Sequence, residues 1–64
     1  MEKLREYVEG ELRFISYLLE SYRGRSLDDL EYGRIAGYVY AFNILKNILR
    51  MIDDEMYKDK MGRE

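Results

Sequence analysis

The sequence contains no cysteine and no histidine, and these two absences remove several classes of protein. No disulfide can form, and the zinc sites common in small domains are excluded. Most of the usual nucleophiles and general bases are missing too, so we predict no enzyme, no catalytic residue, no metal ligand and no cofactor. The lack of cysteine fits a reducing compartment, and the first six residues lack the apolar core of a secretory signal. We therefore expect a cytoplasmic protein.

Proline is also absent, and the only strong break in the helical pattern is a short segment containing glycine and serine. Gly24 can adopt the left-handed conformation that closes a helix. Ser26 can cap the next helix together with the carboxylate of Asp29. The pattern predicts an all-α helical hairpin with a short helix at about 2–22 and a long helix at about 27–58.

The chain has no strong charge of one sign, since 11 basic and 13 acidic residues leave a net charge of −2. Attraction to nucleic acid or to a membrane surface is not indicated. The longest apolar region, 35–52, carries Asn43, Lys46, Asn47 and Arg50. A membrane-spanning helix needs roughly 20 mainly apolar residues with few charges, so we predict no membrane span.

A chain of 64 residues forms a single domain at most, here 1–64. A domain of this size buries only about 60% of the surface of its unfolded chain and is marginally stable alone. Because disulfides and zinc are excluded, oligomerisation is the remaining common means of stabilisation. We expect the hairpin to self-associate into a four-helix-bundle-like dimer or a higher oligomer.

The long helix has an apolar arc wider than the ~100° that one neighbouring helix covers. At 1.5 Å per residue it is also ~48 Å long, against ~32 Å for the short helix. We therefore expect the distal half, 45–56, to project beyond the short helix and to expose Ile48, Leu49, Ile52 and Met56 unless a second molecule covers them. The predicted self-association residues are Gly33, Ile35, Gly37, Tyr38, Ala41, Phe42, Leu45, Ile48, Leu49, Ile52 and Met56.

Three small residues, Gly33, Gly37 and Ala41, stand four apart, as in helices whose backbones approach closely. They can serve a contact between two chains, or they can make room for a bulky side chain within one hairpin. The sequence leaves both interpretations open.

A possible partner surface consists of Tyr32, Val39, Lys46 and Arg50, which share an outer strip of the long helix. Such a strip fits a protein partner of unknown identity, and it also fits an ordinary solvated surface. Both interpretations stay open.

Three arginines near the loop, Arg23, Arg25 and Arg34, could contact an anion or nucleic acid. The alternative is that they serve solubility and helix capping, because acidic residues occupy the same helix start. A third, distant alternative is a carboxylate–metal nucleotide hydrolase. The consecutive acids 53–55 do not support it, since they fan apart on a helix.

The segment marked by Gly33, Gly37, Tyr38, Ala41 and Leu45 resembles stretches in many short helical proteins of phages and prophages. This resemblance implies a mobile-element protein that binds or inhibits a host protein. The length and the helix, turn, helix layout also resemble the plasmid Rop family of RNA-binding dimeric four-helix bundles, which implies the alternative of a nucleic-acid-binding bundle. Rop helices are nearly equal in length, unlike those predicted here, and no functional residues carry over from either resemblance.

Overall fold

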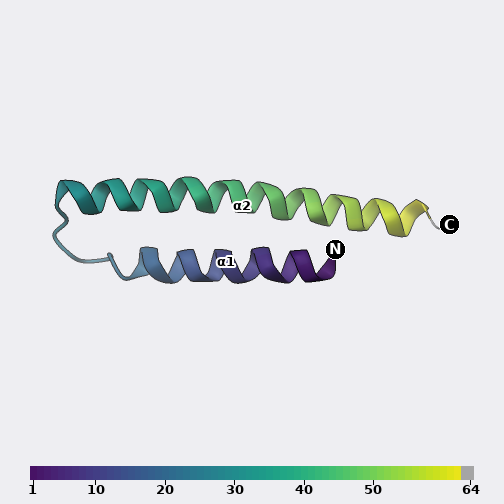
Figure 1. The fold of residues 1–64 in the computed structure, drawn as a ribbon, viewed down its shortest axis with the longest axis horizontal. Coiled ribbons are helices and arrows are strands. Elements are labelled where there is room, and N and C mark those ends of the chain that lie inside the picture. Colours follow the sequence, from purple (N-terminus) through teal and green to yellow (C-terminus); the bar gives the residue numbers. More distant parts are fainter. Residues whose placement is uncertain (63–64) are drawn as a thin grey trace.

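The computed structural model describes the backbone of residues 1–62 and the side chains of residues 1–58. It consists of two antiparallel helices, α1 (Glu2–Glu20) and α2 (Asp29–Gly62), which lie side by side and are joined by one loop (Figure 1). The predicted all-α hairpin is confirmed. The molecule measures 55 × 15 × 14 Å. Its length is set by α2, which continues past the N-terminal end of α1 (Figure 1).

The first helix ends at Glu20, two residues before the predicted end. The Ser21 hydroxyl donates a hydrogen bond to the Leu18 carbonyl, and the Tyr22 amide donates to the Leu19 carbonyl at 3.1 Å. These bonds tighten the last turn and satisfy carbonyls that an α-helix leaves unpaired at its end. Gly24 then takes a φ of 77°, the left-handed conformation expected of it.

The start of α2 differs from the prediction, because Asp28 and Glu31 cap it instead of Ser26 and Asp29. The Glu31 amide donates to Asp28 Oδ1 at 2.8 Å, and the Asp28 amide donates to Glu31 Oε1 at 3.3 Å. This is a reciprocal capping box shifted by two residues. The shift occurs because residues 26–28 carry the chain across to α2, with Leu27 half-buried on the way.

Three side chains among residues 1–58 are buried, namely Val8 and Ile15 on α1 and Ile52 on α2. Half-buried apolar residues of both helices extend this seam toward the loop. Arg5 Nε donates to Asp53 Oδ1 at 2.7 Å across the seam, and this bond raises the pKa of Arg5 above its ordinary value. Both side chains are well exposed, so the ion pair contributes little to the stability of the hairpin. It does show which residues of α1 and α2 lie level with each other.

Two glycine substitutions should change stability in opposite directions. Gly24→Ala forces a side chain into the left-handed region and should lower the free energy of unfolding by about 1–2 kcal/mol. Gly10→Ala should raise it by about 0.5–1 kcal/mol, because Gly10 lies inside α1 and the new carbon would meet only Arg13 Nη2, at 3.9 Å. Urea unfolding followed by circular dichroism measures both. A shift of the same sign in both variants would contradict the assigned conformation of Gly24.

Candidate self-association surface

The structure divides the predicted self-association residues into two groups. The seam group is buried or half-buried against α1 and comprises Ile35, Tyr38, Ala41, Phe42, Leu45, Leu49, Ile52 and Met56. The exposed group comprises Gly33, Gly37 and Ile48. The hairpin itself covers much of the first group, so the second group is the part most open to another molecule.

The expectation that residues 45–56 project past α1 is wrong, and of Ile48, Leu49, Ile52 and Met56 only Ile48 is exposed. Ile52 is 4% exposed, and the adjacent Asp53 receives the bond from Arg5 near the start of α1. The cause lies in the loop: residues 21–28 span the distance along the first turns of α2, so the 19 residues of α1 lie farther along α2 and reach this end (Figure 1). The part of α2 that projects begins farther along the chain.

An apolar surface remains on α2, turned away from the seam. We call it the outer face, and it consists of Leu30, Gly33, Gly37, Ile44, Ile48 and Met51, all of them exposed. At 100° per residue these six positions fall within an arc of about 60°. Leu30 and Met51 are 66% and 65% exposed, while Ile44 and Ile48 are 41% and 37% exposed. The row is therefore continuous along α2 and open to water.

The two glycines of the outer face make room for nothing within the hairpin. A Cβ atom built on Gly33 or Gly37 would meet no atom within 4 Å. Of the two interpretations of the small-residue pattern, packing inside one hairpin is thus excluded for these glycines. Ala41, the third small residue, is half-buried at the seam and belongs to a different side of α2.

Exposed apolar residues of α1 lie on the same side of the hairpin as the outer face. Viewed from one end of the hairpin, the residues of one helix advance clockwise and those of its antiparallel neighbour advance anticlockwise. Residues rotated from the seam by the same angle, each counted along its own helix, therefore project to the same side of the hairpin. Tyr7 and Phe14 meet this condition, and they are 64% and 57% exposed. Leu4, which is 49% exposed, lies nearer the seam. Counting from the Arg5–Asp53 bond, Phe14 lies about level with Ile44. One side of the whole hairpin is therefore mainly apolar.

The possible partner surface lies on a different side of α2. Tyr32, Val39, Lys46 and Arg50 are all exposed and form one strip along the helix. Lys46 Nζ sits 5.8 Å from the centre of the Phe42 ring, a cation–π contact that covers the edge of the seam. This strip is mixed in character, with Val39 as its aliphatic member.

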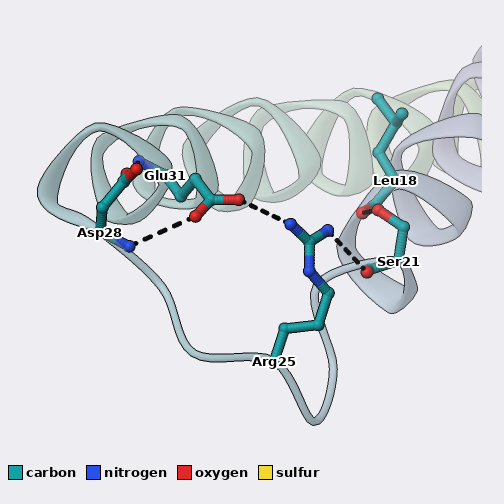
Figure 2. A network of polar contacts seen from close by, with 5 residues as sticks. All are labelled: Leu18, Ser21, Arg25, Asp28 and Glu31. Carbon is teal, nitrogen blue, oxygen red and sulfur yellow. Dashed lines mark hydrogen bonds and ion pairs between the residues drawn. The ribbon is translucent and has the colours of Figure 1, made fainter.

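Of the three arginines near the loop, Arg25 links the end of α1 to the start of α2 (Figure 2). Arg25 lies between the two helix ends, with Nη2 2.9 Å from Glu31 Oε2 and Nη1 donating to the Ser21 carbonyl at 3.3 Å. Arg23 pairs with Glu20 at 3.4 Å, and Arg34 is exposed on α2. Arg23 and Arg25 are thus each paired with a glutamate. Contact with an anion or nucleic acid stays a prediction.

Within the described part of the chain, no group of three or more acidic residues is placed to hold a metal ion. Neither helix, over the same residues, has a stretch both long and apolar enough to cross a bilayer. Comparison with protein-family models, curated proteins and solved structures finds no match to this chain. The geometry of the outer face is therefore the main guide to function.

Proposed function

We propose that this protein is a small, non-catalytic, cytoplasmic interaction module that acts by stoichiometric binding and associates with itself, most simply as a dimer. The observation that carries this proposal is the contrast between its core and its surface. Three described side chains are buried, whereas the outer face and its neighbours on α1 leave a row of large apolar side chains in water. Monomeric proteins rarely leave so extended an apolar surface uncovered.

The exposed area supports the same proposal. The chain exposes 5475 Å² at a mass of 7.8 kDa. A compact monomer of that mass exposes about 4,400 Å². The excess of about 1,100 Å² is comparable to the roughly 800 Å² that each partner buries in a standard protein–protein interface. Covering one side of the hairpin would bring the exposed area close to the value for a compact protein.

The strip of Tyr32, Val39, Lys46 and Arg50 stays free in such a dimer and is the surface we propose for a second, different protein. A host protein bound by a mobile-element protein is one partner of this kind. Nucleic-acid binding in the manner of the Rop family has less support, because Arg25 is engaged with Glu31 and Ser21.

The mass in solution tests the proposal directly. Light scattering over a hundredfold dilution series should give twice the chain mass of 7.8 kDa at the concentrated end and a fall toward one chain on dilution. The melting temperature should fall over the same series, because dilution favours the dissociated, less stable form. A single chain mass together with an unchanged melting temperature throughout would overturn the proposal.

A further inference from the structure

We infer that the outer face binds a second copy of this chain, with α2 packed antiparallel against α2 of that copy in one specific register. This inference rests on the proposed self-association and adds the surface and the alignment. In this register Gly37 faces Ile44 of the second copy, Gly33 faces Ile48, and Leu30 faces Met51. The basis is the order of large and small residues along the outer face.

The outer face is self-complementary when one copy is reversed. When two copies of a helix pack antiparallel about a twofold axis, residue numbers rise along one copy as they fall along the other. The numbers of any two facing residues therefore add up to the same value, and each contact occurs twice. The three pairs named above all have the same sum, so a single register satisfies all of them. It places both glycines opposite isoleucines, and no glycine faces a glycine. The 3, 4 and 7 residue spacings are common to any helix face, so what favours this register is the placing of each glycine opposite an isoleucine.

The shapes of the two rows also fit. Ile44 and Ile48 are four residues apart and form a ridge on the helix surface, while Gly33 and Gly37 are four apart and form a depression. Nothing in the hairpin occupies the space above either glycine, so the isoleucines of a second copy can enter it. The contact runs from Leu30 to Met51, about 32 Å at 1.5 Å per residue.

The polarity of the two sides favours a second copy on this side of the hairpin. The outer face lies on the same side as Phe14 and Tyr7 of α1, whereas the opposite side carries Lys46 and Arg50. Stacking two apolar sides removes them from water together and leaves the charged sides exposed. The excess exposed area of about 1,100 Å² per chain is enough for such an interface.

A double-mutant cycle on one facing pair tests the register. Gly37→Leu should weaken dimerisation at least about tenfold, because leucine would then oppose isoleucine and overpack the contact. Ile44→Ala should weaken it by a similar factor, because it leaves a cavity above Gly37. The variant carrying both substitutions places the new leucine opposite the new alanine. It should dimerise more tightly than either single variant and within a few-fold of the original chain. Sedimentation equilibrium measures the dissociation constants.

The control combines Ile44→Ala with Gly33→Leu, two positions that do not face each other in this register, and it should show no rescue. Circular dichroism at the same concentrations checks that each variant keeps its helices, which leucine favours over glycine. Equal rescue by both double variants, or rescue by neither, would overturn the register. The proposed function would still be supported in that case if the original chain is dimeric. An original chain that stays monomeric would overturn both.

Discussion

Replacing Ile44 by aspartate should raise the dissociation constant of the proposed dimer about a hundredfold or more. Ile44 lies near the middle of the outer face and is 41% exposed in the single chain. A twofold axis would bury two such carboxylates in each dimer, opposite glycines that offer no partner charge. Burying an unpaired charge is strongly unfavourable, and a hundredfold change corresponds to only about 2.7 kcal/mol. Sedimentation equilibrium or light scattering over a dilution series measures the effect.

The chain offers a matched control in Val39, which is 42% exposed on a different side of the same helix. Val39→Asp introduces the same charge and a similar loss of helix propensity. It should leave the dissociation constant within a few-fold of that of the original chain. If both substitutions weakened the dimer equally, the effect would come from the helix itself and the outer face would not be the interface.

Replacing Ile52 by alanine should lower the free energy of unfolding by about 2–4 kcal/mol, the usual range for truncating a large buried aliphatic side chain. Ile52 is 4% exposed and is one of three buried residues in the described part of the chain. Small domains have only a few kcal/mol of stability, so this variant should be largely unfolded at room temperature when dilute. Urea unfolding at one fixed chain concentration measures the loss, because association contributes to apparent stability.

Val39→Ala is the control for this second experiment, since it truncates an aliphatic side chain of the same helix that is already in water. Its effect should lie within about 0.5 kcal/mol of zero. A loss below about 1 kcal/mol for Ile52→Ala would show that α1 does not cover this part of α2, contrary to the Arg5–Asp53 register.

The loop shows which features local signals can predict and which they cannot. The left-handed Gly24 was predictable because few other residues adopt that conformation at low cost. The cap was not, because the sequence offers two pairs with the same spacing, Ser26 with Asp29 and Asp28 with Glu31. Only the path of the chain across to α2, together with the bond from Arg25 to Glu31, selects the second pair.

Periodicity and helix stop signals are local properties of the chain, so the amino-acid sequence was enough to predict two helices joined by one turn. It was also enough to predict that α2 has more apolar surface than one neighbour covers. Which part of that surface meets α1 depends on how the two helices pack. An apolar arc wider than one seam allows several rotations of α2, and burial of Ile52 with Val8 and Ile15 selects one of them. That rotation leaves Gly33, Gly37 and Ile48 in water.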